Sequence, residues 1–270
     1  MLLAEKAVDQ YFGESLDKWN KTEVIKIGDL GKKFSLNIFN NLQDKVNYKI
    51  NNLNQIWQDA PQEDLFMNPD GGITRLTKLL YETNEQFGNI YNSLCSYLLS
   101  KFAPNKVIQR HPTIRVNASS SFNNFIPYWH SDLLIGHPVG TLNIWIPFTD
   151  PHKDQFNGFN ICNSEISQNF YFKMREKSDP YQFLEHEEVP KSKILMENST
   201  PVKVSVGEAI VFDSRCFHSA VPMIEHSRVS MDIRIIDKKF LEFPYPTFQG
   251  LGRKKAKFDL ENYYKEYVNF

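Results

Sequence analysis

The stretch Tyr128-Trp129-His130-Ser131-Asp132 decides how the rest of the chain is interpreted. In an extended strand, residues i and i+2 lie on the same face, so the imidazole of His130 and the carboxylate of Asp132 can meet at one point. A second imidazole would complete a metal site, and the candidate for it is His218, which follows the apolar segment 209–213. Two imidazoles and one carboxylate on one face of an octahedral ion leave its remaining positions open.

A second His-x-Asp pair, His152 and Asp154, has the same spacing. It runs into Asn157-Gly158, which are turn residues, so this pair is interpreted as part of an exposed turn. The pair at His130 is followed instead by residues 141–148, in which aliphatic side chains alternate with polar or aromatic ones as in a strand. The His130 pair is therefore the better candidate for metal binding.

The segments around His218 also have strand patterns. Residues 201–206 alternate, Gly207-Glu208 is a turn, and residues 209–213 form a second strand before the histidine. Ten residues after His218, the segment 228–236 is a further strand. The sequence thus predicts antiparallel β structure on both sides of the second imidazole.

Arg228 and Ser230 share one face of the strand 228–236. A guanidinium and a hydroxyl two residues apart can hold one carboxylate, the guanidinium as a charged fork and the serine as an extra donor. Arg228 could instead pair with a surface carboxylate, and Arg234, on the same face of the strand, is the alternative residue for this role.

The order of these features resembles the Fe(II)/2-oxoglutarate-dependent dioxygenase superfamily over roughly residues 107–237. The motifs that carry the resemblance are His130-x-Asp132, His218 and Arg228-x-Ser230. Asn157-Gly158 and the segment 207–212 before the second histidine are similar to the phytanoyl-CoA-hydroxylase-like branch, and within it to bacterial oxygenases of carbohydrate and aminoglycoside-type gene clusters. Such enzymes often carry a Pro-Gly-Ser-His-like turn after Asn-Gly, and residues 159–165 replace it here.

The resemblance implies an α+β, mainly β fold: a double-stranded β-helix of the jelly-roll or cupin-like type, with N-terminal helices packed on the sheet. It implies Fe(II), 2-oxoglutarate as co-substrate, and O2. The implied metal ligands and catalytic residues are His130, Asp132 and His218. The residues expected to bind the co-substrate are Arg228, Ser230 and Asn143; Asn143 shares a strand face with Trp145, which can alternatively fill the core.

The reaction that the resemblance implies is oxidative decarboxylation of 2-oxoglutarate to succinate, coupled to oxidation of a substrate C–H bond. Asp132 occupies the ligand position that halide uses in the related halogenases, so hydroxylation or a closely related oxidation is preferred over halogenation. The expected substrate is a small polar metabolite, such as a free or activated sugar, with an amino acid or an acyl thioester as the alternative. The rival function is a non-catalytic cupin-like protein that binds a metal or a sugar.

Composition limits the partners. A net charge of −1 gives no general attraction to nucleic acid or to an anionic membrane, and no apolar run approaches the length of a membrane-spanning helix. The three cysteines are widely spaced and odd in number, which fits neither a disulfide framework nor a thiolate metal site. We expect a cytoplasmic protein that binds a small molecule; the oligomeric state stays open.

The 270 residues are interpreted as a single domain. Residues 1–106 are mainly helical, 107–237 form the jelly-roll core with a polar insertion or lid at 163–200, and 238–270 are a C-terminal tail. Within these parts we expect a short strand at 24–28, a loop at 61–72, helices at 73–81 and 85–102, and a closing helix at 258–270.

Overall fold

The computed structural model of the chain describes residues 22–65, 73–82, 85–102, 104–117, 129–132, 137–138, 140–151, 157–174, 193–220, 225–242 and 258–266. The His152 and Asp154 pair lies outside the described residues, as do the central part of the expected insertion, 175–192, and the first 21 residues of the part expected to be mainly helical.

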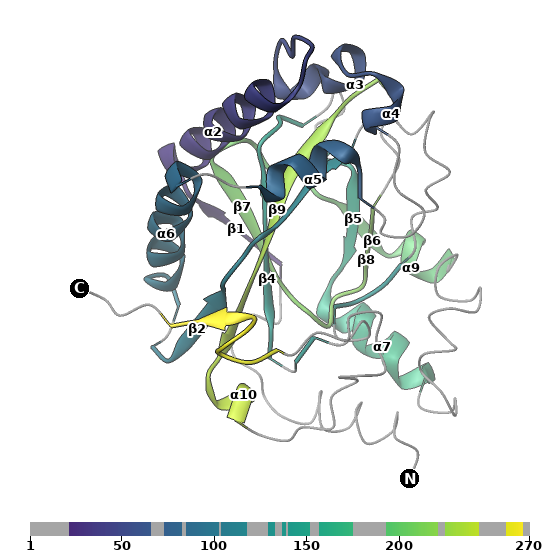
Figure 1. Ribbon diagram of the computed structural model, residues 1–270. Helices are drawn as coiled ribbons and strands as arrows, with labels where there is room; N and C mark the ends of the chain where they lie inside the picture. The colour runs from purple at the N-terminus through teal and green to yellow at the C-terminus, as the bar shows by residue number, and fades with distance from the viewer. Residues whose placement is uncertain are drawn as a thin grey trace.

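Two antiparallel sheets form the centre of the structure (Figure 1). The large sheet runs in the order β1 (Glu23–Lys26), β7 (Glu208–Asp213), β4 (Leu142–Pro147), β9 (Arg228–Asp237), β2 (Lys106–Gln109) and β10 (Tyr264–Lys265), and β3 (Thr113–Asn117) also pairs with β9. The small sheet runs in the order β6 (Ser199–Pro201), β5 (Phe159–Cys162) and β8 (His218–Ala220). The predicted α+β class with mostly antiparallel strands is confirmed.

The chain moves repeatedly between the two sheets. It passes from β3 in the large sheet to a bridge between His130 and β8 of the small sheet, and then to β4 in the large sheet. It continues through β5 and β6 in the small sheet, β7 in the large, β8 in the small and β9 in the large. Strands β1 and β10 extend the large sheet from outside the 107–237 core that the sequence predicts.

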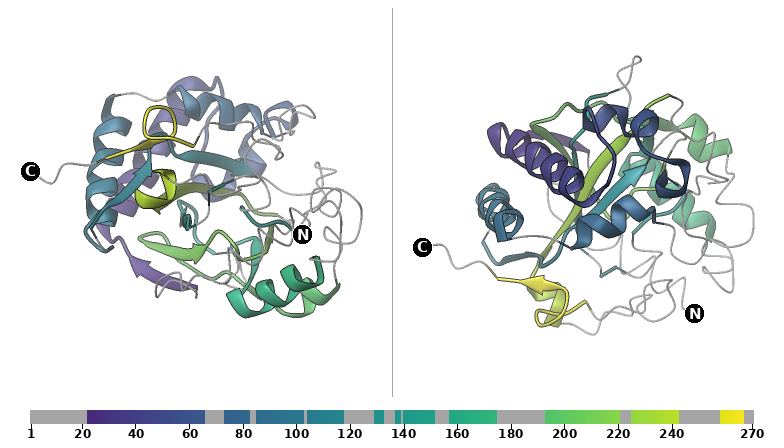
Figure 2. Two further views of the ribbon diagram at one scale, coloured as in Figure 1. Left: turned by 90° about the horizontal axis from the view of Figure 1, so that it is seen from below. Right: turned by 45° about the horizontal axis from the view of Figure 1, so that its top comes forward.

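Helices cover one face of the large sheet (Figures 1 and 2). These are α2 (Asp29–Lys45), α5 (Arg75–Tyr81) and α6 (Glu85–Leu99). Along β9, every second residue from Val229 to Ile235 is buried and apolar and packs with helix residues such as Phe34 and Leu94 in one core. Alternation of apolar side chains gives the sheet this face, and burying each large side chain contributes about 1.5–3 kcal/mol. The prediction that N-terminal helices pack on the sheet is confirmed.

The opposite face of the large sheet packs against the small sheet. Trp145 of β4 and Phe212 of β7 pack with Phe159 and Ile161 of β5 in a second apolar cluster. The rings of Trp145 and Phe159 meet edge to face with centroids 4.8 Å apart. We call this the inner face; it also carries Arg228, Ser230, Asp232 and Arg234, because these residues alternate with the apolar outer ones along β9.

Several predicted elements differ from the structure. The described ends of the 163–200 insertion are ordered as α7 (Ser164–Met174), α9 (Lys193–Glu197) and β6, not as irregular loop. Asn163 explains the start of α7, since its side-chain oxygen accepts from Ile166 N at 2.8 Å, as helix caps do. The strand expected at 201–206 ends at Pro201, and beyond it the Asn157 amide replaces strand pairing by bonding Val204 N and O at 2.7 and 2.9 Å.

The predicted closing helix is wrong for the described residues 258–266, which form turns and β10. Asp259 fixes this turn, because its side chain accepts from Glu261 N and Asn262 N and its carbonyl accepts from Tyr264 N. The expected loop at 61–72 contains the short helix α4 (Gln62–Leu65). The remaining short helices are η1 (Leu53–Gln55), α3 (Ile56–Asp59) and α10 (Lys239–Glu242).

None of the helices in the described part of the chain is long and apolar enough to cross a bilayer. All three cysteines are buried free thiols. Burial raises the pKa of the Cys162 thiol to about 12, so this side chain stays protonated and behaves as a small apolar residue.

Candidate metal centre

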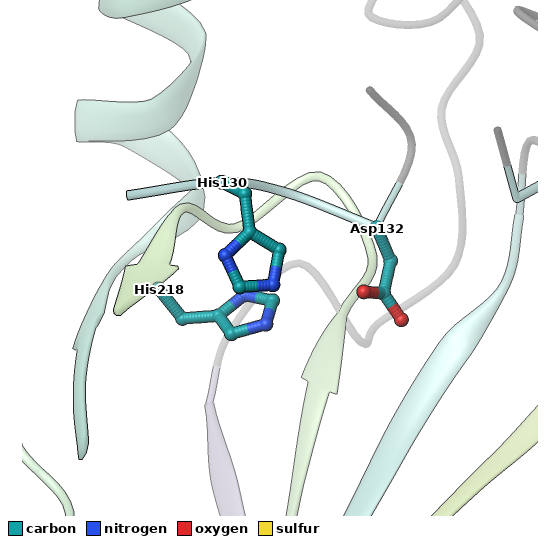
Figure 3. A group of neighbouring side chains, drawn as sticks. All are labelled: His130, Asp132 and His218. Carbon is teal, nitrogen blue, oxygen red and sulfur yellow. The ribbon is translucent and has the colours of Figure 1, made fainter. Parts of the chain in front are cut away.

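The structure brings together the three residues predicted to bind metal. One potential ligand atom each from His130, Asp132 and His218 lies within 4.8 Å of the others (Figure 3). The two imidazole rings are neighbours, with centroids 4.3 Å apart, and the Asp132 carboxylate lies beside them. Among the described residues this is the cluster of histidine, cysteine and carboxylate side chains that can hold a metal ion.

Backbone pairing places the two histidines. His130 N donates to His218 O at 3.0 Å, and His218 N donates to His130 O at 2.8 Å, forming an isolated antiparallel bridge. Directly opposed residues of an antiparallel pair project their side chains to the same face, which brings the rings together. On its other side His218 is opposite Ile161 of β5. Backbone partners therefore flank His218 on both sides.

The His218 ring is also oriented by its neighbours. Its Nδ1 lies 3.1 Å from the carbonyl oxygen of Cys216, and the Phe212 ring packs against it edge to face at 5.2 Å. A proton on Nδ1 that is donated to Cys216 leaves the Nε2 lone pair for a metal, the usual arrangement of a metal-binding histidine. The preceding turn is fixed by Asp213, which accepts from Arg215 N at 2.9 Å and from Arg215 Nε at 2.8 Å.

Asp132 is buried and contacts Arg234 on β9. Its Oδ2 accepts from Arg234 Nε at 2.9 Å and lies 2.8 Å from Arg234 Nη2. Burial alone would lower the pKa of the Arg234 guanidinium, but the Asp132 carboxylate, with Tyr263 and Asp232, outweighs burial and raises it. Arg234 is therefore positively charged, and its charge is paired with the carboxylate of Asp132, one of the predicted metal ligands.

Arg228 is buried in a different setting. Its Nη1 donates to Gly158 O at 2.5 Å, and Asn117, with its amide oxygen turned toward the guanidinium, accepts from Nη2 at 2.5 Å and Nε at 3.3 Å. Within the described part of the chain, no carboxylate lies at ion-pair distance from Arg228. Burial lowers the pKa of Arg228 to about 10, and Asp232 offsets only part of this effect. At neutral pH the inner face thus holds a buried positive charge that these residues do not neutralise.

Two other predicted co-substrate residues present unsatisfied polar atoms. Ser230 Oγ and Asn143 Oδ1 are buried and have no hydrogen-bond partner among the residues that the structure describes. Asn143 lies opposite Arg234 across β4 and β9, whereas Ser230 is next to Arg228 on the inner face. Buried polar atoms are normally hydrogen-bonded, so unsatisfied ones at a candidate site point to a polar ligand.

Sequence reasoning missed several residues of this site. Arg234 was expected only as a substitute for Arg228, and its contact with Asp132 has no sequence signal. The contacts of Asn117 and Gly158 with the Arg228 guanidinium also have no sequence signal. Trp145, one candidate for the pocket lining, instead packs on Phe159 in the apolar cluster of the inner face.

Solved structures that are similar to this chain include a non-heme monooxygenase and an α-ketoglutarate-dependent carbocyclase. One is the non-heme monooxygenase ThoJ in a nickel complex, 10% identical, with 84% of this chain and 78% of that chain covered and a TM-score of 0.46. EvdO2 from Micromonospora carbonacea var. aurantiaca, complexed with 2-oxoglutarate, is 11% identical over 80% of this chain and 86% of that one, with a TM-score of 0.44. The α-ketoglutarate-dependent carbocyclase SnoK from nogalamycin biosynthesis is 14% identical over 88% and 87%, with a TM-score of 0.42.

No protein-family model matches the sequence, and no curated protein matches it either.

Proposed function

We propose that this protein is an Fe(II)- and 2-oxoglutarate-dependent oxygenase with His130, Asp132 and His218 as its metal ligands. The observation that carries the proposal is the convergence of these three side chains within 4.8 Å of one another, on a face that also holds the unneutralised guanidinium of Arg228. A metal site alone fits many proteins, but a buried guanidinium with no carboxylate at ion-pair distance among the described residues, on the same face, fits a metal enzyme with an acidic co-substrate.

The fold is part of this proposal. The alternation of the chain between the two sheets supports a double-stranded β-helix, with β3, β4, β7 and β9 in one sheet and β5, β6, β8 and His130 in the other. A single core that contains both the helices and the large sheet supports one domain.

The donor set fits Fe(II). Two imidazoles and one carboxylate suit this ion and leave positions for other ligands, whereas thiolates would favour other metals. The nearby thiols do not compete, since Cys162 and Cys216 are buried and burial raises the pKa of both.

The inner face also fits 2-oxoglutarate. Arg228 would bind the distal carboxylate, Ser230 Oγ would donate to the same group, and the Asn143 side chain would meet the co-substrate nearer the metal. A carboxylate in this place would neutralise the buried guanidinium and satisfy the serine hydroxyl, both of which are costly to leave unpaired.

Fe(II), 2-oxoglutarate and O2 together would supply the oxidation of a substrate C–H bond, with succinate and CO2 formed from the co-substrate. The chain's own contribution is to position and shield. Cys216 O fixes the His218 ring, Arg228 orients the co-substrate, and the packed rings of Trp145, Phe159 and Phe212 keep water from one side of the site.

For the substrate we propose a small polar metabolite, with a free or activated sugar as the leading class. Support comes from Arg115 of β3 and Asp232 of β9, which lie diagonally across the pairing of these two strands, with Arg115 Nε 3.6 Å from Asp232 Oδ2. Their side chains are 40% and 22% exposed, in contrast to the buried Arg228 and Ser230. A guanidinium and a carboxylate that both reach solvent beside the site can bond hydroxyl groups.

The test is succinate release from 2-oxoglutarate in air with Fe(II), across sugars, sugar nucleotides, amino acids and acyl thioesters. The control is His130→Ala, which should release no succinate above background. Stimulation by sugars or sugar nucleotides supports the proposal in full. Succinate release that only amino acids or acyl thioesters stimulate would make these the substrate class in place of sugars. No 2-oxoglutarate turnover with any compound favours a non-catalytic metal- or sugar-binding protein.

A further inference from the structure

We propose that Arg234 is a positioning residue for the metal: it holds Oδ2 of Asp132, so that the carboxylate binds the ion through one oxygen. The C-terminal segment 258–266 in turn holds Arg234. This inference rests on the metal site proposed above and adds a residue that the binding of co-substrate does not require.

The contact between Arg234 and Asp132 has the geometry of a fork. Nε and Nη2 both reach the same oxygen, Oδ2, at 2.9 and 2.8 Å, so the guanidinium lies on one side of the carboxylate. Both side chains are almost fully buried, at 7% and 2% exposed, so the pair is little screened by solvent. Two charge-assisted donors on Oδ2 hold that oxygen in place and occupy the side of it that they approach.

Further groups fix the guanidinium itself. Arg234 Nη1 lies 3.5 Å from Gln109 Oε1, and Gln109 is opposite Tyr264 in the pairing of β2 with β10. The Tyr263 phenol lies close to Arg234: burial raises the pKa of Tyr263 to about 12, and the neighbouring guanidinium opposes that rise. The C-terminal segment therefore lies next to Arg234, through Tyr263 and through the pairing of Tyr264 with Gln109.

The same segment reaches Asp132 by a second route. The Phe258 ring packs on the Tyr263 ring at 4.8 Å and on the His137 ring at 4.5 Å. His137 Nε2 lies 3.9 Å from Asp132 Oδ2, and His137 N donates to Asp132 O at 3.0 Å. The rings of Tyr263, Phe258 and His137 thus form a layer behind the carboxylate. The His137 ring in this layer is near Oδ2, the same oxygen that Arg234 contacts.

The consequence concerns the open metal positions. A carboxylate that turns can bind a metal through both oxygens, which would fill a position that co-substrate or O2 needs. With Oδ2 held by Arg234, one-oxygen binding is favoured. Groups that hydrogen-bond a ligating side chain typically contribute about 10–100-fold to metal affinity.

The experiment uses the full chain and Co(II), an air-stable and coloured stand-in for Fe(II), without 2-oxoglutarate. Metal affinity and the visible Co(II) spectrum are measured for the wild type, Arg234→Met and Arg234→Lys. Arg228→Met is the matched control, because it removes another buried guanidinium from the same face of β9 without contacting Asp132. Circular dichroism checks the folding of each variant.

We expect Arg234→Met to lower Co(II) affinity about 10–100-fold and to change the visible spectrum, with partial rescue by Arg234→Lys. Arg228→Met should keep the wild-type affinity and spectrum. If Arg234→Met does not fold, Arg234→Lys decides, since it keeps the charge but loses the fork. Wild-type affinity and spectrum in every folded Arg234 variant overturn this inference alone. A wild-type protein that binds no metal overturns the proposed function and this inference together.

Discussion

His130 and His218 exchange two backbone hydrogen bonds, of 3.0 and 2.8 Å, at the edge of the small sheet. The positions of the two imidazoles are therefore set by the main chain, before any metal binds. A site prepared in this way loses less conformational entropy on binding than one assembled from flexible side chains.

The proposed metal ligands give the first prediction. His130→Ala and His218→Ala should each lower Fe(II) or Co(II) affinity by more than about 100-fold, because loss of a ligand costs more than loss of a group that supports one. Titration of the purified protein should give one ion per chain for the wild type. His111→Ala, at an exposed histidine outside the cluster, is the control and should bind normally. Equal stoichiometry and affinity in all four proteins would refute the ligand assignment.

The second prediction separates the two arginines of β9. Arg228→Met should weaken 2-oxoglutarate binding about ten-fold or more, since a charge-assisted hydrogen bond contributes about 1.5–3 kcal/mol. Ser230→Ala should weaken it less. The measurement is a titration of 2-oxoglutarate into the metal-loaded protein. Unchanged binding in Arg228→Met, together with weaker binding and normal metal affinity in Arg234→Met, would move the carboxylate-binding role to Arg234.

A third prediction concerns the contact between α2 and the turn before β7. A Cβ at Gly31 would lie 2.8 Å from Gly207 Cα, which is main chain and cannot move aside easily. Gly31→Ala should therefore lower the free energy of unfolding by about 1–3 kcal/mol, the usual range for overpacking. Urea denaturation measures it.

Gly88 in α6 is the matched control, because a Cβ there meets nothing within 4 Å. Gly88→Ala should raise stability by about 0.5–1 kcal/mol, the helix preference for alanine over glycine. Equal effects of the two substitutions would show that Gly31 is not needed for close packing.

The fourth prediction concerns Asn157, which is buried and bonds both polar groups of the Val204 backbone. Asn157→Ala would leave a buried N–H and a buried carbonyl without these partners, so we expect a loss of about 2–5 kcal/mol. The exposed Asn198, which donates to Ile194 O, is the comparison, and Asn198→Ala should cost less than about 1 kcal/mol. Comparable losses in thermal denaturation would contradict this role of Asn157.

The sequence alone determined the features that depend on local periodicity. Strands β4, β7 and β9 and helices α5 and α6 lie where alternation and helical spacing predict them, because these patterns record which faces are buried. The spacing of His130 and Asp132 and the distant His218 likewise indicated one metal site. Periodicity did not predict the backbone where one side chain determines it by a hydrogen bond. Asn163 does so at the start of α7, and Asp259 does so in the C-terminal turn.

Only the tertiary structure distinguished Arg228 from Arg234. Both lie on the inner face of β9, because a strand repeats every two residues, and nothing in their sequence separates their roles. Asp132, far away in the chain, neutralises Arg234, whereas the described surroundings of Arg228 provide a carbonyl and an amide. The free energy of a buried charge depends on which groups the fold places beside it, and that is fixed by long-range packing rather than by neighbours in the sequence.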